Sequence, residues 1–180
     1  SPALVLYKEL IAANLQRMLD IAGGPDRLRP HVKTHKMPQV VRMKMDLGIT
    51  KFKCATIAEA EMVAMCGARD VLIAYQLVGP NQARLVRHKQ KFPECTFSVL
   101  VDHPAAAGSL SEVAAAAKLT VPVWPDIDVG QHRTSGDRVV IDRPRDELEL
   151  RSHRDLFRRF RFLRRRRRIA RHHHGHDCER

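Results

Sequence analysis

Hydrophobic and polar positions form two kinds of segment along roughly the first 130 residues. Short apolar runs predict buried strands, and the longer stretches between them carry apolar residues at helical spacing and predict helices. We predict strands within residues 3–7, 28–33, 51–55, 70–75, 96–102 and 120–130. We predict helices within residues 8–24, 37–48, 56–68, 81–92 and 103–119.

This alternation amounts to about six β-α units. Short loops and nearly continuous apolar strands are typical of a parallel sheet covered by helices. Such a sheet can stay open and doubly wound, or it can close into a (β/α)8 barrel. The pattern GxGxxG, which marks nucleotide-binding open sheets, does not follow the first strand. We therefore expect an α/β fold, a partial (β/α)8 TIM-type barrel, because closure needs two more units than this sequence supplies.

The segment 56–68 has the clearest helix signals. Thr56 fits the N-cap position, and Glu59 stands three residues later, where a capping box places its acidic residue. Gly67 fits the position that ends a helix. These signals fix the start and end of one helix without help from tertiary structure.

The net charge of +12 suggests a nucleic-acid partner, but more than half of the excess charge lies in the last quarter of the chain. Residues 1–135 hold 17 Lys and Arg against 12 Asp and Glu, and residues 136–180 hold 15 against 8. All nine lysines lie in the first range, and the second contains a five-arginine run with no convincing apolar periodicity. We therefore expect no packed core from the tail.

These differences divide the chain into a barrel domain, residues 1–134, and an Arg/His-rich tail, residues 135–180. One hypothesis is that the tail is disordered, or is translated from a shifted reading frame of a GC-rich gene. The rival hypothesis is a genuine tail that binds nucleic acid by neutralising phosphates. Because the first 135 residues contain no nucleic-acid module, the sequence does not favour nucleic acid as a partner.

The four cysteines are widely scattered and form no CxxC pair. This arrangement indicates neither a zinc ribbon nor a disulfide framework, and reduced thiols fit a cytoplasmic protein. No apolar run approaches the ~18–20 residues that span a bilayer, so we expect no membrane partner. A His-x-Cys pair occurs in the tail motif HHHGHDC, but nothing around it supplies supporting ligands, and we assign no metal-binding residues.

The stretch RPHVKTHK, residues 29–36, gathers basic side chains at the end of the second predicted strand. Functional residues of parallel α/β folds lie at the carboxyl ends of strands, where Lys33 falls. Strand alternation would turn His31 and Lys33 to the same face, the barrel interior. A buried lysine has a depressed pKa and becomes a neutral, nucleophilic amine. The alternative is a solvated lysine at a wet strand end.

Three segments together resemble a known family. RPHVKTHK is followed by KFKCATIAEAEMVAMCGARDVLIAYQLVGP and later by DIDVGQHRT. In this order the segments resemble the fold-type III pyridoxal phosphate (PLP) enzymes, in the D-threonine aldolase and D-serine dehydratase branch, which is distantly related to alanine racemase. The likeness covers about residues 2–134. It implies a (β/α)8 barrel followed by a β-rich C-terminal domain, with PLP bound as a Schiff base on Lys33.

The resemblance also suggests roles for other side chains. His31 could contact the cofactor or tune the lysine, or could simply be a satisfied interior histidine. Arg133 could approach an anionic oxygen of the cofactor or substrate, or form a salt bridge to Asp126 or Asp128. Gln76 is a weaker candidate for the pocket, and His35 could line its mouth. Cys54 is expected to pack rather than react.

The implied activity is that of a PLP-dependent lyase for D-β-hydroxy amino acids, which cleaves its substrate to glycine and an aldehyde. D-serine dehydratase and amino-acid racemase activities are alternatives within the family. Relatives of full length are expected to be homodimers and to use a divalent metal, Mn or Zn. After Thr134 the likeness stops, so the phosphate-binding and metal-binding segments are expected to be absent here. An inactive, incomplete barrel is therefore the alternative from another class.

Overall fold

Four parallel strands and their connecting helices make up most of the computed structural model of this chain. The structure describes residues 5–126 and three short backbone segments, 138–141, 148–150 and 160–163. The strands are β1 (Lys51–Cys54), β2 (Asp70–Gln76), β3 (Thr96–Val101) and β4 (Val121–Pro125). They lie side by side in this order, and each pairs in parallel with the next.

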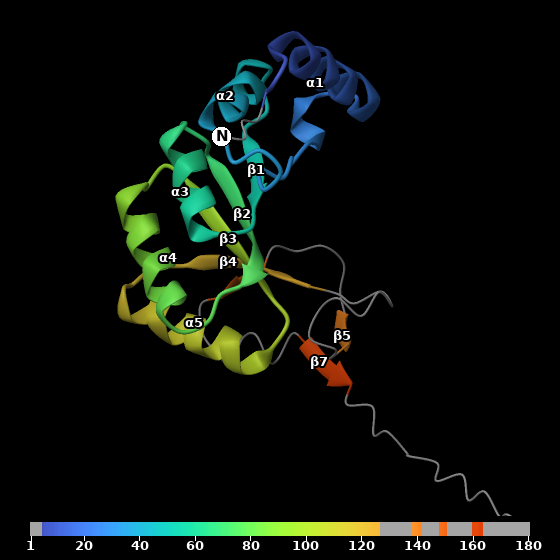
Figure 1. Cartoon of the computed structure of the whole chain (residues 1–180). Helices are drawn as coiled ribbons and strands as arrows, with labels where there is room; N and C mark the ends of the chain where they lie inside the picture. The colour runs from blue at the N-terminus through green and yellow to red at the C-terminus, as the bar shows by residue number, and fades with distance from the viewer. Residues whose placement is uncertain (1–4, 127–137, 142–147, 151–159, 164–180) are drawn as a thin grey trace, which may run out of the picture.

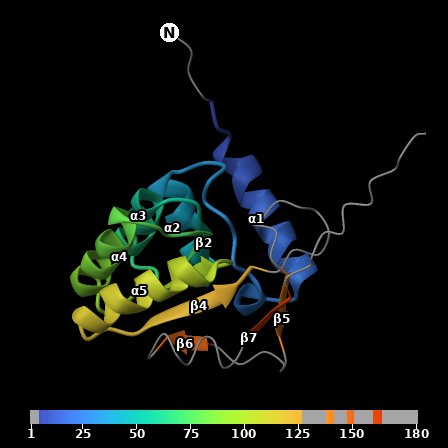
Figure 2. The same ribbon diagram turned by 90° about the horizontal axis from the view of Figure 1, so that it is seen from below.

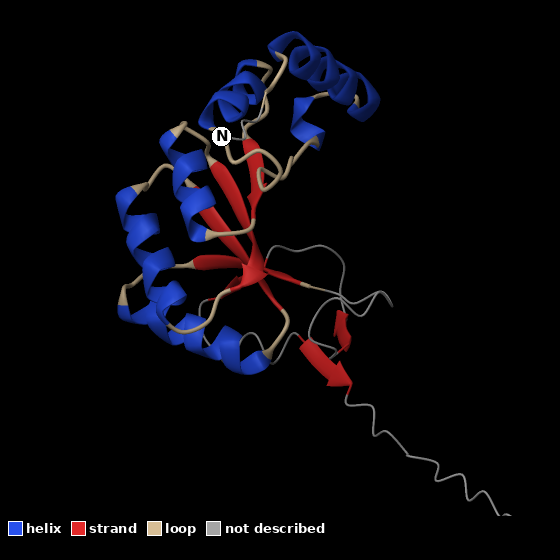
Figure 3. Cartoon of the chain, viewed as in Figure 1, coloured by secondary structure: helices blue, strands red, loops and turns tan. Residues whose placement is uncertain are grey.

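Three helices connect these strands and cover one side of the sheet (Figures 1 and 3). They are α3 (Ile57–Met65), α4 (Pro80–Lys91) and α5 (Pro104–Ala116). The chain begins with α1 (Lys8–Ala22), a 3-10 turn η1 (Pro25–Arg27) and α2 (Pro38–Asp46), which lie near β1 (Figures 1 and 2). This arrangement of a parallel sheet with covering helices confirms the expected α/β fold and agrees with a partial barrel.

The core lies between the sheet and these helices. Alternate residues of neighbouring strands stand in register on this side, as in the row formed by Phe52, Val71 and Phe97. All three side chains are fully buried. Leu110 of α5 belongs to the same core cluster and is only 2% exposed. Burial of such apolar side chains contributes about 1.5–3 kcal/mol each and fixes the sheet against its helices.

The helix termini follow the expected local chemistry. Thr56 caps α3, because its Oγ1 accepts a hydrogen bond from the Glu59 N–H at 3.1 Å. A proline occupies the first turn of α2, α4 and α5, where the missing N–H costs nothing. Gly23 ends α1 in the left-handed conformation, with φ of 75°, and its N–H bonds to the Leu19 carbonyl.

Two predicted strands are not regular strands in the structure. Residues 5–7 belong to no strand, and residues 28–33 are reduced to a single parallel bridge between His31 and Lys53. The Lys53 N–H donates to the Pro30 carbonyl, and the Val32 N–H donates to the Lys53 carbonyl. Pro30 has no N–H of its own, which limits how far the ladder can extend.

The chain after residue 126 contributes three short strands. β6 (Leu148–Leu150) pairs antiparallel with β4 at the edge of the sheet. β5 (Arg138–Ile141) and β7 (Phe160–Leu163) pair antiparallel in a separate two-stranded sheet. Regular backbone thus occurs in a region where the composition predicted none. The domain division at residue 134 lies outside the described residues and stays a prediction.

Length and hydropathy rule out a transmembrane helix among the helices that the structure describes.

Candidate active site

The candidate site lies at the edge of the sheet where the parallel strands end. Parallel pairing brings the carboxyl ends of β1, β2, β3 and β4 to this one edge. The chain segment before α2 joins the same edge, because His31 pairs with Lys53 of β1. The turn over residues 33–35 follows directly, so the sheet positions Lys33 at the edge where α/β folds carry their functional groups.

Lys33 begins a tight turn and does not continue a strand. The N–H groups of His35 and Lys36 both donate to the Val32 carbonyl, at 3.2 and 2.8 Å. Lys36 completes the turn in the left-handed region, with φ of 50°. The Lys33 side chain is exposed, which agrees with the alternative of a solvated lysine at the strand end. The strand alternation that would have turned this side chain inward ends at Val32.

His31 lies next to this turn and is half-buried. Its Nδ1 accepts a hydrogen bond from the Lys33 backbone N–H at 3.2 Å. A neutral imidazole carries one proton, and this bond assigns that proton to Nε2. Burial lowers the pKa of His31, and the positive charges of Lys33 and Lys53 lower it further. His31 is therefore neutral at pH 7 and offers its Nε2–H as a hydrogen-bond donor.

His35 lies on the other side of the turn, against α2. Its Nδ1 accepts from the Met37 backbone N–H at 3.1 Å, and its Nε2 lies 3.0 Å from Lys44 Nζ. Burial is the largest cause that lowers the pKa of His35 to about 4. Lys44 is only 7% exposed, and burial lowers its pKa as well. The two histidines of RPHVKTHK thus hold the turn from its two ends.

Glu59 connects this turn to β1 and α3. The carboxylate is 5% exposed; one oxygen accepts from the Ala55 N–H at 2.8 Å, and the other lies 3.5 Å from Lys36 Nζ. The capping box correctly placed Glu59 at the start of α3, but its ion pair with Lys36 was not predicted from the sequence. The signal was present, since Lys36 and Glu59 both lie in the segments that carry the family resemblance.

Arg29 reaches across the sheet on the side opposite the helices. Its guanidinium binds the Asp70 carboxylate with two hydrogen bonds of 2.7 and 2.6 Å, and it lies 5.8 Å from the centre of the Trp124 ring. Asp70 begins β2 and Trp124 lies in β4, so side chains from two strands meet around one cation. Sequence reasoning missed this cluster. The alternation of Arg29 and His31 was the signal that could have placed them on one face.

Gln76 joins the ends of two strands. Its Oε1 accepts hydrogen bonds from the backbone N–H groups of Asp102 and His103, at 2.9 and 2.8 Å. Its carbonyl therefore ties the end of β2 to the chain just after β3. Because this oxygen is already bonded, Gln76 would contact a ligand through its amide NH2 group.

Cys54 packs in the core, as expected from the sequence. Its side chain is fully buried, and its Sγ lies 3.6 Å from the Leu72 carbonyl oxygen. Burial is the largest cause that raises the pKa of the Cys54 thiol to about 12, so the thiol stays protonated at neutral pH.

Arg133 and Asp128 lie outside the described residues, as does the tail motif HHHGHDC. The predicted role of Arg133 therefore remains a prediction. Within the described part of the chain, no three His, Cys, Asp or Glu side chains converge on a possible metal site.

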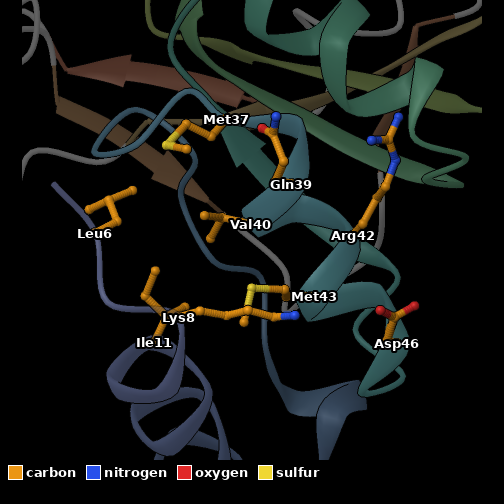
Figure 4. Close-up of a pocket in the computed structure, with 9 residues that line it drawn as sticks. All are labelled: Leu6, Lys8, Ile11, Met37, Gln39, Val40, Arg42, Met43 and Asp46. Carbon is orange, nitrogen blue, oxygen red and sulfur yellow. The ribbon is translucent and has the colours of Figure 1, made fainter. Parts of the chain in front are cut away.

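A separate cavity of about 460 Å³ lies between the start of α1 and the outer side of α2 (Figure 4). Leu6 and Ile11 line it from one side, and Val40 and Met43 line it from the other. Its lining does not include Lys33, so this cavity and the candidate site are different places.

The parallel sheet, its covering helices and the functional groups at its carboxyl edge define a barrel-type α/β domain. Residues 8–136 match the family described as alanine racemase, N-terminal domain. This chain therefore belongs to the alanine racemase N-terminal domain family, whose members depend on pyridoxal phosphate.

Characterised relatives lie in one branch of that family. D-threonine aldolase of an Arthrobacter species is 33% identical over 144 residues, which are 78% of this chain and 38% of the relative. D-threo-3-hydroxyaspartate dehydratase of Delftia sp. (strain HT23) is 28% identical over 74% of this chain and 35% of the relative. The crystal structure of D-threonine aldolase from Filomicrobium marinum matches with a TM-score of 0.68 and 34% identity, over 75% of this chain and 36% of that one. This chain thus spans little more than a third of the length of these relatives.

Proposed function

We propose that this chain is the cofactor-binding barrel part of a PLP-dependent lyase for small D-β-hydroxy amino acids. The observation that carries the proposal is the position of Lys33. Its amine is exposed at the carboxyl edge of the sheet, in the turn that RPHVKTHK forms. The similarity to D-threonine aldolases and the family match over residues 8–136 support the same assignment.

The side chains around Lys33 fit the aldehyde side of PLP. A primary amine is the group that bonds covalently to an aldehyde, and Lys33 offers one that a ligand can reach. The His31 Nε2–H and the nearby ammonium of Lys53 suit the oxygen atoms of an anionic ring. When bound, PLP supplies an electron sink for the charge that develops on the substrate α-carbon.

The chain's own residues would then have separate tasks. Lys33 would hold the cofactor, and its Nζ, when not bonded to the cofactor, could take or return a proton. His31 stays neutral, since burial and its two lysine neighbours lower its pKa, and donates through Nε2. It is therefore a donor to an oxygen atom and not the base of the reaction. Arg133 would place a permanent positive charge near the substrate, and Gln76 would offer its amide NH2.

A divalent metal ion and a homodimer are further parts of this proposal. The resemblance implies Mn or Zn bound to the substrate hydroxyl, held by residues of a C-terminal domain, and a homodimer. We derive no metal-dependent step from the described residues. The proposed place of such a metal is beyond the barrel, where relatives have additional chain.

Dehydration of the same class of substrates is the second candidate. The similarity to D-threo-3-hydroxyaspartate dehydratase supports it, and this relative matches over 74% of the chain. An aldolase cleaves the Cα–Cβ bond and releases glycine with an aldehyde. A dehydratase breaks the Cα–H bond, loses the hydroxyl and releases a keto acid with ammonia. Product analysis after incubation with D-threonine and with D-threo-3-hydroxyaspartate separates the two reactions.

The proposal is tested by adding PLP to the purified chain and following absorbance in the visible range. We expect a new band for the wild type and none for Lys33→Ala. Lys91→Ala, which changes an exposed lysine of α4, is the matched control and should keep the band. Borohydride reduction followed by peptide mapping should place the label on Lys33. A label on another lysine, or no label at all, would contradict the proposal.

A further inference from the structure

Lys44 is a buried lysine that the proposed reaction does not use. It lies in α2, which follows RPHVKTHK in the sequence, and it is only 7% exposed. Lysines are rarely so buried unless they are paired, because a desolvated ammonium is costly. The contact that the structure gives its Nζ is a nitrogen, His35 Nε2, at 3.0 Å. An imidazole nitrogen can accept from an ammonium group only when it carries no proton, so the meaning of this contact depends on the tautomer of His35.

The second nitrogen of His35 decides which group donates in this contact. Nδ1 accepts a hydrogen bond from the Met37 backbone N–H at 3.1 Å, so Nδ1 carries no proton. A neutral imidazole then has its proton on Nε2, which makes Nε2 the donor toward Lys44. Lys44 must accept with the lone pair of a neutral amine. A charged Lys44 would need the opposite tautomer, whose Nδ1–H would face the Met37 N–H.

The burial of both groups favours this neutral pair. Burial is the largest cause that lowers the pKa of His35 and the cause that lowers the pKa of Lys44. Glu59 acts in the opposite direction on His35. Its carboxylate, however, is already bound to the Ala55 N–H and lies 3.5 Å from Lys36 Nζ. This negative charge is thus partly neutralised by another lysine.

The Lys44–His35 contact acts directly on the turn that contains Lys33. The His35 N–H donates to the Val32 carbonyl, while the His35 ring holds the Met37 N–H just after the turn. If the ring rotated or changed tautomer, the Met37 bond would be lost and the turn would gain freedom. Lys44 therefore influences Lys33 through His35, without contact of its own.

We propose that Lys44 is a positioning residue: as an uncharged amine it accepts the His35 Nε2–H bond and fixes the tautomer that holds the turn of Lys33. The consequence for PLP rests on the proposed function, whereas the tautomer does not.

The direct test is nuclear magnetic resonance of the full chain labelled with ¹⁵N in its histidines, at pH 7. We expect His35 to show a protonated Nε2 and an unprotonated Nδ1, with the signal identified by its loss in His35→Gln. A proton on Nδ1 would overturn the inference, whether or not the chain binds PLP. A ¹⁵N signal of Lys44 Nζ typical of an ammonium group at pH 7 would overturn it as well.

Two substitutions of Lys44 separate positioning from simple packing. Lys44→Gln provides a carbonyl that can accept from Nε2–H, whereas Lys44→Met keeps the apolar length and provides no acceptor. We expect Lys44→Met to weaken PLP binding, followed as the visible band, by about tenfold, because the buried His35 Nε2–H is then left without an acceptor. Lys44→Gln should restore binding to within about threefold of the wild type, since it replaces the lost hydrogen bond.

Lys91→Met is the control for the loss of a lysine, and circular dichroism checks that each variant is folded. Equal loss in the Gln and Met variants would overturn the positioning role. If the wild type shows no visible band, the proposed function fails, and the tautomer measurement still decides the inference on Lys44.

Discussion

Arg29 and Asp70 form a bidentate ion pair, with two hydrogen bonds of 2.7 and 2.6 Å, although 41 positions separate them in sequence. Both side chains are largely covered, at 22% and 30% exposure. The pair joins the first residue of RPHVKTHK to the first residue of β2. It thereby locks the irregular segment 28–33 onto the regular sheet, a task that one isolated β-bridge would do poorly.

Replacing Asp70 by Asn should lower the free energy of unfolding by about 1–3 kcal/mol. Removal of one partner leaves the other charge partly buried and uncompensated, which costs more than loss of a surface pair. Urea unfolding followed by circular dichroism measures the change. Glu94→Gln, which makes the same kind of change at an exposed loop residue, is the matched control. An Asp70→Asn variant as stable as this control would show that the ion pair contributes nothing to the fold.

Replacing Thr56 by Ala should lower the free energy of unfolding by about 1 kcal/mol, because the N-cap hydrogen bond to the Glu59 N–H is lost. Thr56→Ser keeps the hydroxyl and should lose only a few tenths of that amount. Denaturant titration of both variants checks the prediction. Similar losses for Ala and Ser would assign the effect to the methyl group and not to the cap.

The pH dependence of stability should carry a contribution from His35. Its pKa in the folded chain is about 4, below the usual 6.5, so the unfolded chain binds a proton more readily. The free energy of unfolding should therefore fall as the pH is lowered from about 6.5 toward 4. Burial is the largest cause of this lowered pKa, and the charge of Glu59 acts in the opposite direction.

Comparison with His35→Gln isolates this contribution, because other titrating groups are shared by the two proteins. Between pH 7 and pH 4 the wild type should lose on the order of 1–3 kcal/mol more than the variant. Parallel stability curves for the two proteins would contradict a lowered pKa for His35.

Local sequence signals predicted most of the regular elements. The apolar runs in β1, β2 and β3 and the Thr56 cap are local features, and the structure has the predicted strand or helix start at each of them. The segment 28–33 was predicted as a strand on the same grounds. It has too few backbone hydrogen bonds for one, because pairing depends on neighbours that a local pattern does not contain.

The candidate site was predictable only in part. RPHVKTHK indicated Lys33 as the cofactor lysine, and this role stays a prediction. The structure shows only that the residue lies at the carboxyl edge of the sheet. Its exposure did not follow from strand alternation, since alternation stops where a turn begins. The pairing of His35 with Lys44 and of Arg29 with Asp70 depends on tertiary packing between separate elements, and neither has a local sequence signature.

Trp124 is the single tryptophan of the chain. Its ring lies in β4, 41% exposed, near the guanidinium of Arg29 and on the side of the sheet away from the helices. Intrinsic fluorescence excited at the indole band therefore comes from one known place. The emission of this ring is a built-in optical reporter of events at the inner surface of the strands. Quenching or energy transfer to an absorbing ligand can be followed there without any dye or added label.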